Sequence, residues 1–212
     1  MNGTDWPRLA ANSSIVEQHN ELRPRATQSF RRKTIHVVRI SAGDEHAVVL
    51  DSSGFVYTWG KSYGGALGHG GETDETTLEI LSSLKSHLAV QVCVRKRKIF
   101  VLVDTGSVYG FGWMGFGSFG FPDRGVSDKI TRLWILDNLR GHYISQISIG
   151  LHRTIAVIHK WRIFGLGDNE RVQLRHDTLR GSPELVEIFV QEATEMQAMT
   201  RKVAMRTRLG TS

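Results

Sequence analysis

Gly54-Phe55-Val56-Tyr57-Thr58-Trp59-Gly60 is the stretch that decides the fold, because two related stretches follow it along the chain. The second is Gly106-Ser107-Val108-Tyr109-Gly110-Phe111-Gly112, and the third is Trp161-Arg162-Ile163-Phe164-Gly165-Leu166-Gly167. The closing glycine moves from position 60 to 112 and then to 167, so the repeat is a little over fifty residues long. Self-similarity at a period of this length is typical of repeat architectures such as propellers. We therefore expect three copies of one structural unit.

Each unit contains two predicted strands joined by a tight turn. Gly43 and Gly150 stand ahead of two apolar runs, Ala47–Leu50 and Ile155–Ile158, and the glycine-rich block follows each run. Short β-branched and aromatic runs separated by glycine indicate consecutive antiparallel strands. Glycine reaches the positive φ of a hairpin turn without a Cβ clash, and the aromatic residues are expected to fill the space between stacked sheets. We assign such structural roles to Gly43, Gly54, Trp59, Gly60, Gly68, Gly106, Phe111, Gly112, Gly120, Gly150 and Gly167, with Leu166 in place of the aromatic residue in the third copy.

The first copy, followed by Gly64-Gly65-Ala66-Leu67-Gly68, resembles the repeat of the regulator of chromosome condensation family. The resemblance covers residues 38–176 and implies a β-propeller whose blades are four-stranded sheets, usually seven in number. The functions that it implies are varied: the founding members exchange nucleotide on the small GTPase Ran and dock on nucleosomes, while others sense ultraviolet light or act as scaffolds.

The chain departs from this family pattern in the number of repeats and in their first residues. Only three repeats are present, so we expect an all-β fold that forms an incomplete β-propeller of about three blades. The opening Gly43-Asp44-Glu45-His46, in which we expect His46 to be a structural hydrogen-bonder, is replaced by Arg95-Lys96-Arg97-Lys98 in the second copy. The third copy has Gly150-Leu151-His152-Arg153-Thr154, which lacks the tryptophan of the family's photoreceptor motif and argues against light sensing.

The repeats lie between two segments of different character. Residues 1–33 are polar and rich in arginine, and we expect a mobile basic arm. Residues 34–182 hold the propeller repeats. In residues 183–212 the apolar period becomes helical, with Leu185, Phe189, Ala193, Met196 and Val203 on one stripe. We expect an amphipathic C-terminal α-helix that caps the open edge of the last blade or docks on a partner.

The run Arg95-Lys96-Arg97-Lys98 is the sharpest charged feature of a chain whose net charge is +6. Adjacent cations repel one another, so we expect all four to stay solvated and to face water or an anionic partner. The alternatives are a solvated strand end without a partner, a nuclear import signal and a contact with nucleic acid. These four residues are the candidate site for an anionic partner.

Motifs that would indicate catalysis or a cofactor are weak. The strings Gly110–Gly115 and Gly115–Gly120 match Gly-x-Gly-x-x-Gly, but Phe121-Pro122 follows where a nucleotide-binding loop would open a helix. The single cysteine, Cys93, excludes an intramolecular disulfide, and no histidine spacing is typical of a metal site. We therefore expect no catalytic residue, no metal and no cofactor.

These observations predict a non-catalytic protein-interaction or chromatin-binding module in the nucleus or the cytoplasm. The alternatives are guanine-nucleotide exchange on a Ran-like small GTPase and a truncated product with little function. We expect a protein partner, such as chromatin or a small GTPase, and no membrane. The open blade edges also predict self-association, because unpaired strands at a sheet edge are templates for pairing.

Overall fold

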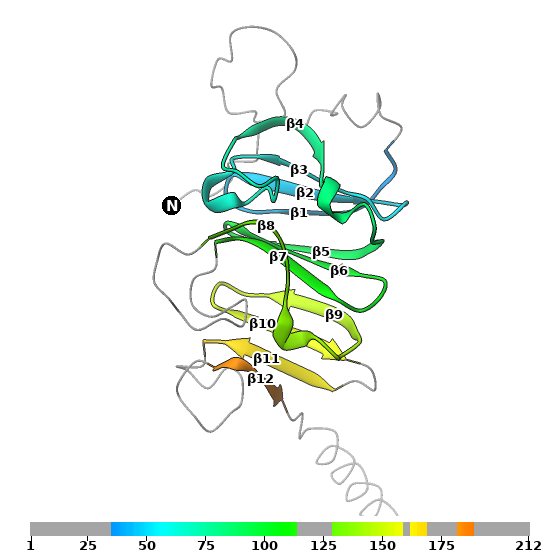
Figure 1. Cartoon of the computed structure of the whole chain (residues 1–212), viewed down its shortest axis with the longest axis vertical. Helices are drawn as coiled ribbons and strands as arrows, with labels where there is room; N and C mark the ends of the chain where they lie inside the picture. Colours follow the sequence, from blue (N-terminus) through cyan, green and yellow to red (C-terminus); the bar gives the residue numbers. More distant parts are fainter. Residues whose placement is uncertain (1–34, 114–128, 159–161, 169–181, 189–212) are drawn as a thin grey trace, which may run out of the picture.

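The chain folds into three four-stranded antiparallel sheets that follow one another in sequence order (Figure 1). The computed structural model describes residues 35–113, 129–158, 162–168 and 182–188. The first sheet contains β1 (Val37–Ala42), β2 (His46–Asp51), β3 (Val56–Gly60) and β4 (Glu75–Ile80). The second contains β5 (Ala89–Arg95), β6 (Lys98–Val103), β7 (Val108–Trp113) and β8 (Lys129–Ile135), and the third β9 (Ile144–Ile149), β10 (Arg153–Ile158), β11 (Ile163–Gly167) and β12 (Ser182–Ile188). Short 3-10 helices lie at Tyr63–Gly65, Ser82–Leu84 and Asp137–Leu139.

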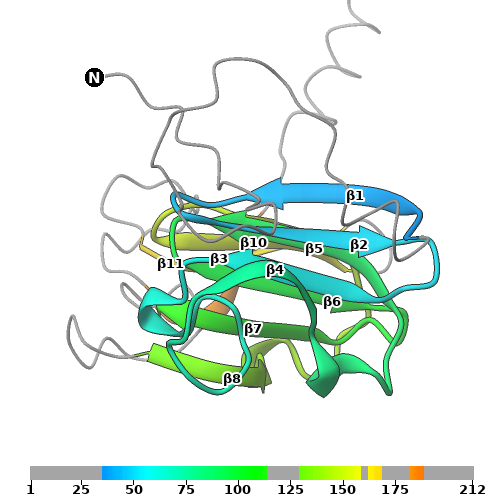
Figure 2. The same cartoon turned by 90° about the horizontal axis from the view of Figure 1, so that it is seen from above.

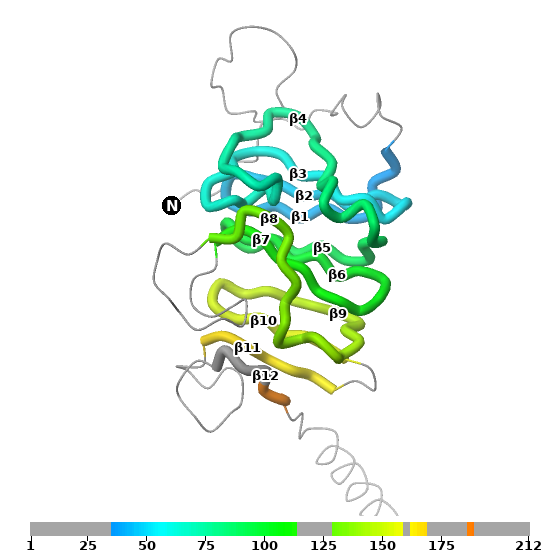
Figure 3. Tube along the Cα trace, viewed as in Figure 1, coloured from blue at the N-terminus to red at the C-terminus, as the bar shows by residue number. Residues whose placement is uncertain are grey.

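The three sheets are stacked, and each is built from consecutive strands. Figure 3 shows the trace completing one sheet before it enters the next, and Figure 2 shows the sheets lying over one another. Because the strands alternate in direction, their connections gather at two rims. The first rim carries the β1–β2, β5–β6 and β9–β10 turns, and the second rim carries the β2–β3 and β6–β7 turns.

The predicted strand–turn–strand units are confirmed as three equivalent hairpins. The closing glycine of each repeat pairs with the first residue of the preceding strand: Gly60 with His46, Gly112 with Lys98 and Gly167 with Arg153. Gly112 has a φ of +104°, and a Cβ on it would clash with the carbonyl oxygen of Arg97. The residue after each closing glycine then donates its backbone N–H across the turn, as Trp113 does to Arg97 at 2.9 Å. Only glycine combines this φ with so close an approach.

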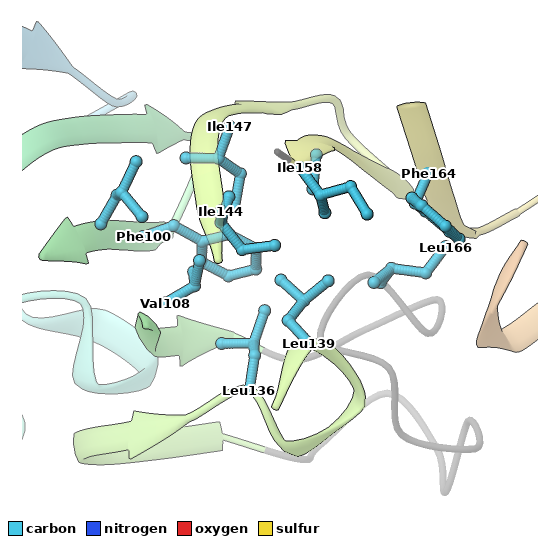
Figure 4. Packing of buried hydrophobic residues seen from close by; sticks show 11 residues of the cluster. Phe100, Val108, Leu136, Leu139, Ile144, Ile147, Ile158, Phe164 and Leu166 are labelled. Atoms are coloured by element: carbon cyan, nitrogen blue, oxygen red, sulfur yellow. The ribbon is translucent and has the colours of Figure 1, made fainter. Parts of the chain in front are cut away.

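Apolar side chains fill the two spaces between the sheets. Successive residues of a strand point to opposite faces of its sheet. The second sheet lies in the middle, so one of its faces packs against the first sheet and the other against the third. One cluster joins the first and second sheets and includes Val48, Leu50 and Phe111. Another joins the second and third sheets around Phe100, Ile147 and Leu166 (Figure 4). A third cluster, which includes Trp59 and Val49, lies on the face of the first sheet that points away from the second.

The loop after β3 also ties the first sheet to the second. The backbone N–H of Gly70 donates to the carbonyl oxygen of Thr131 at 2.8 Å, and Lys129 Nζ donates to Glu72 Oε1 at 2.6 Å. Gly68 packs against the ring of Phe111, where a Cβ would come within 2.9 Å of ring carbons. The loop therefore acts as a clasp across the interface.

The expectation of a helix from Pro183 is wrong for residues 183–188, which belong to strand β12. This strand pairs with β11 through Gly165 with Val186 and Ile163 with Ile188, and so completes the third sheet. The described residues contain no α-helix and no helix long and apolar enough to cross a membrane. The remainder of the predicted helix, residues 189–212, and the predicted arm, residues 1–33, lie outside the described residues.

Candidate anionic-partner site

The candidate site is the turn between β5 and β6 at the first rim. Arg95 and Lys98 face each other at the strand ends, and Lys96 and Arg97 form the turn between them. Lys96 has a φ of +50° and is the one non-glycine residue with positive φ in the described part of the chain. The side chains of Arg95, Lys96 and Arg97 are exposed. A tight hairpin thus holds three cations in water within one turn.

Lys98 corrects the expectation that all four cations are solvated. Its side chain is only 1% exposed, and its Nζ donates to the carbonyl oxygen of Leu151 at 2.7 Å. Burial and, to a smaller extent, the charge of Arg95 lower the pKa of Lys98 to about 7. The reason is its position in the repeat, since Lys98 takes the place of the buried His46 and points between sheets. The candidate site is therefore reduced to Arg95, Lys96 and Arg97.

An aromatic side chain from the loop after β3 adjoins this turn. The Arg97 guanidinium lies 4.2 Å from the ring centroid of Tyr63, which is 61% exposed. A guanidinium over an aromatic face is attracted by the quadrupole of the ring. The contact adds an exposed aromatic surface to the three cations. Nothing in the sequence signals this contact, because Tyr63 precedes Arg97 by more than thirty residues and belongs to another repeat.

Charge changes sign along the first rim. In the third sheet, burial and the positive charges of Lys98, Lys96 and Arg153 lower the pKa of His152, against the opposite effect of Asp168. In the first sheet, the equivalent turn carries the exposed acids Asp44 and Glu45. Gly43 at its start packs so tightly on the second sheet that a Cβ would clash with the Lys96 carbonyl oxygen. Positive charge is thus gathered over the second and third sheets and bordered by acids.

The residues expected to have structural roles occupy turns and interfaces. Gly54 and Gly106 lie in the β2–β3 and β6–β7 turns with φ of +82° and +79°, and they pack against Leu88 and Tyr143 of the next sheet. Gly150 donates its backbone N–H to Arg153 at 2.8 Å, as Gly43 does to His46. Trp59, Phe111 and Leu166 are buried in the apolar clusters. Gly120 lies outside the described residues, as does the whole of the second Gly-x-Gly-x-x-Gly string.

His46, the expected structural hydrogen-bonder, is buried at the turn and takes part there through its backbone. Its backbone oxygen accepts from Gly43, whereas its Nε2 has no hydrogen-bond partner among the described residues. Burial lowers the pKa of His46 to about 4, so the ring is neutral near pH 7. No group of three His, Cys, Asp or Glu side chains that could hold a metal occurs in the part of the chain that the structure describes.

Comparison with known proteins agrees with the repeat structure. Residues 37–65 match the Regulator of chromosome condensation (RCC1) repeat. The chain belongs to the RCC1-repeat family. The human E3 ubiquitin-protein ligase HERC2 is 30% identical over 167 residues, which is 78% of this chain and 3% of HERC2. The ultraviolet-B receptor UVR8 of Arabidopsis thaliana is 26% identical over 87% of this chain and 41% of the receptor. This RCC1-repeat chain therefore spans less than half the length of these relatives.

Solved structures show the same fold. Prp20p of Saccharomyces cerevisiae, described together with its binding properties to Gsp1p and histones, aligns with a TM-score of 0.62. The two chains are 17% identical, and the match covers 80% of this chain and 44% of Prp20p. A yeast RCC1 (Prp20) bound to Kap60 aligns with a TM-score of 0.61 at 18% identity. At these identities the likeness concerns the fold, in which each sheet corresponds to one propeller blade.

Proposed function

We propose that this RCC1-repeat chain is a non-catalytic interaction module that binds an anionic partner, chromatin above all, in the nucleus or the cytoplasm. The observation that carries the proposal is the β5–β6 turn, where Arg95, Lys96 and Arg97 are exposed side by side. The turn is fixed by ladder pairing at both ends and by the buried Lys98. Cations held in one place by a rigid scaffold bind phosphates at a lower entropic cost than cations on a flexible tail.

The distribution of charge also supports an anionic partner on the second and third sheets. The cations of the β5–β6 turn lie near His152 and Arg153 of the next sheet, whereas the acids Asp44 and Glu45 border them on the other side. A polyanion would be attracted to the first group and repelled by the second. The stacked Tyr63 and Arg97 offer a flat surface beside the charges. We therefore place the contact over the second and third sheets.

The test is binding to DNA and to reconstituted nucleosomes at several salt concentrations. We expect the double variant Arg95→Gln/Lys96→Asn to bind more weakly, and more so at low salt, because phosphate contacts release counterions. The plot of log affinity against log salt concentration should become less steep, its slope decreasing in magnitude by about 1–2 for two lost phosphate contacts. Asparagine is chosen for position 96 because it tolerates positive φ. Fluorescence anisotropy with labelled DNA measures both quantities.

The matched control removes two positive charges from the opposite rim. Lys85 and Arg140 are exposed in the β4–β5 and β8–β9 loops, so Lys85→Gln/Arg140→Gln gives the same net charge change. We expect this control to bind nearly as well as the wild type. Equal losses in the two double variants would mean that only net charge matters, and no binding at low ionic strength would refute the proposal.

Nucleotide exchange on a Ran-like GTPase is the second candidate. The observation that favours it is the likeness in fold to Prp20p, which was described with its binding to Gsp1p. The chain covers 44% of that protein, and an exchange factor needs a wide preformed surface to hold a nucleotide-free GTPase. We expect catalytic amounts of the chain to leave nucleotide release unchanged. Faster release would reverse the order of the two functions.

A further inference from the structure

The interface between the second and third sheets contains a specific polar link. The side chain of Gln91 donates from Nε2 to the carbonyl oxygen of Ile147 at 2.7 Å. The backbone N–H of Ile147 donates in return to Gln91 Oε1 at 3.1 Å. The Gln91 amide thus binds both backbone groups of Ile147 on the side of β9 that faces away from β10, and Cys93 Sγ donates to the same carbonyl oxygen at 3.4 Å. This link fixes how the third sheet docks on the second.

The outer face of the third sheet repeats the docking face of the second. In the second sheet, Gln91, Leu102 and Val108 lie opposite one another across β5, β6 and β7. The same register in the third sheet places Gln146, Val157 and Ile163 across β9, β10 and β11. Leu102 and Val108 are buried by the third sheet, whereas Gln146 is exposed and Val157 and Ile163 are half-buried. The third sheet therefore presents a docking face that no described residue covers.

The edge strand β1 of the first sheet presents the complementary surface. Ile40 pairs with Val49 as Ile147 pairs with Ala156, so Ile40 occupies the position of Ile147 in its own sheet. Ile147 is 2% exposed, but Ile40 is 63% exposed. Gly43 pairs with His46 through a backbone hydrogen bond, and the alternation of an antiparallel ladder then directs the N–H and C=O of Ile40 away from β2. These two groups are the ones that a glutamine in the position of Gln91 would bind.

We propose that two copies of this chain associate head to tail, with Gln146 of one copy binding the Ile40 backbone of the other. The Ile40 side chain packs on Val157 and Ile163, as Ile147 packs in the internal interface. Contact surfaces that differ on the two copies are heterologous, so a pair can close into a ring or add further copies. The partner is a second copy because the chain itself carries both complementary faces. The proposal does not depend on an anionic partner.

The experiment measures mass by light scattering over a concentration series. The wild type should reach at least twice the mass of the single chain as its concentration rises. Ile40→Asp and Gln146→Arg each remove one of the two faces at an exposed position, so each should stay monomeric alone and remain folded. A mixture of the two variants retains one intact pair of faces and should form a one-to-one dimer. Leu88→Asp, an exposed apolar position at the second rim, is the control and should associate like the wild type.

Three results would overturn the proposal. The first is a wild type that stays monomeric at the highest soluble concentration, which would mean that a second copy does not occupy these faces. The second is association of Ile40→Asp alone at the level of the wild type, which would indicate contact between two identical faces. The third is a mixture of the two variants that remains monomeric while the circular dichroism of each variant matches that of the wild type.

Discussion

Lys98 carries an ionisable group inside the interface between the second and third sheets, where its Nζ donates to the neutral carbonyl oxygen of Leu151. Removing an ammonium group from water disfavours its charged form, which explains the direction of its pKa shift. Three neighbours of the same type, Arg95, Lys96 and Arg97, remain exposed in the adjoining turn. Position within the hairpin, and not residue type, therefore decides which cation is available to a partner.

Stability should depend on pH through Lys98. Its ordinary pKa of 10.5 applies to the unfolded chain, and the folded value is about 7. Between these values the unfolded chain binds more protons, so the free energy of unfolding should rise from pH 7 toward pH 10 and stay flat below pH 7 as far as this group is concerned. Lys98→Met should lack that rise. Urea unfolding at pH 7 and pH 9 measures the difference.

The control for this comparison is Lys85→Met, which removes an exposed lysine at the opposite rim. It should keep the wild-type dependence on pH. If Lys98→Met shows the same rise as the wild type, then Lys98 keeps its proton in the folded chain and the assigned environment is wrong.

At the scale of single elements, the three hairpins could be predicted because glycine and aromatic residues recur at the same offsets. The fourth strand of the third sheet could not. Glu184, Leu185, Val186, Glu187 and Ile188 follow Pro183 with apolar and acidic residues that fit either a strand or a helix. These residues form a strand because β12 pairs with the free edge of β11. Arg162 also donates two hydrogen bonds, of 2.7 and 2.6 Å, to Glu187. Local sequence does not contain that information.

The candidate site shows the same division. The charge run predicted four solvated cations, and three of the four are exposed, whereas Lys98 is buried. Burial of Lys98 could have been inferred by aligning it with His46, because both precede an apolar strand at the same place in the repeat. The contact of Arg97 with Tyr63 depends on how two sheets stack, and no short-range pattern encodes it.

The closing glycine of each hairpin should be irreplaceable for a steric reason beyond its φ. Gly112→Ala would force an alanine into φ +104° and against the Arg97 carbonyl oxygen, whereas Gly141→Ala has φ +86° with nothing within 4 Å. Backbone strain alone costs about 1–3 kcal/mol. We expect Gly141→Ala to lose stability within that range and Gly112→Ala to lose more. Thermal and urea unfolding compare the two, and equal losses would show that the close approach is relieved without cost.

At the scale of the whole molecule, three sheets of one design are joined in a row, and the apolar clusters of the described residues join sheets that follow one another in the sequence. In such an architecture stability is a sum of terms within sheets and terms between sheets. The interface terms here include apolar clusters, the clasp after β3 and single polar links such as Gln91. Gln91 and Gln146 recur 55 residues apart, at the interval of the closing glycines Gly112 and Gly167. The sequence therefore already contained the signal for this link, although a lone glutamine has no meaning until the register is known.

Substitutions at Gln91 and at Gln146, compared with each other, distinguish a role in the interface between sheets from an effect of glutamine within its own strand. Gln91→Ala leaves the Ile147 N–H without its partner inside the interface and leaves the Ile147 carbonyl oxygen only the weaker donor Cys93 Sγ at 3.4 Å, and an unsatisfied buried group costs about 1–3 kcal/mol. Gln146→Ala occupies the same register position on an exposed face and should cost little when the chain is dilute. Urea unfolding at low protein concentration compares the two variants under conditions where copies do not associate. At higher protein concentration, the loss in free energy of unfolding caused by Gln91→Ala should stay the same. Gln146→Ala should then become less stable relative to the wild type, because only this variant loses a contact between chains. Equal deficits at low concentration would mean that Gln91 contributes through its own strand and that its link to Ile147 adds nothing to the interface.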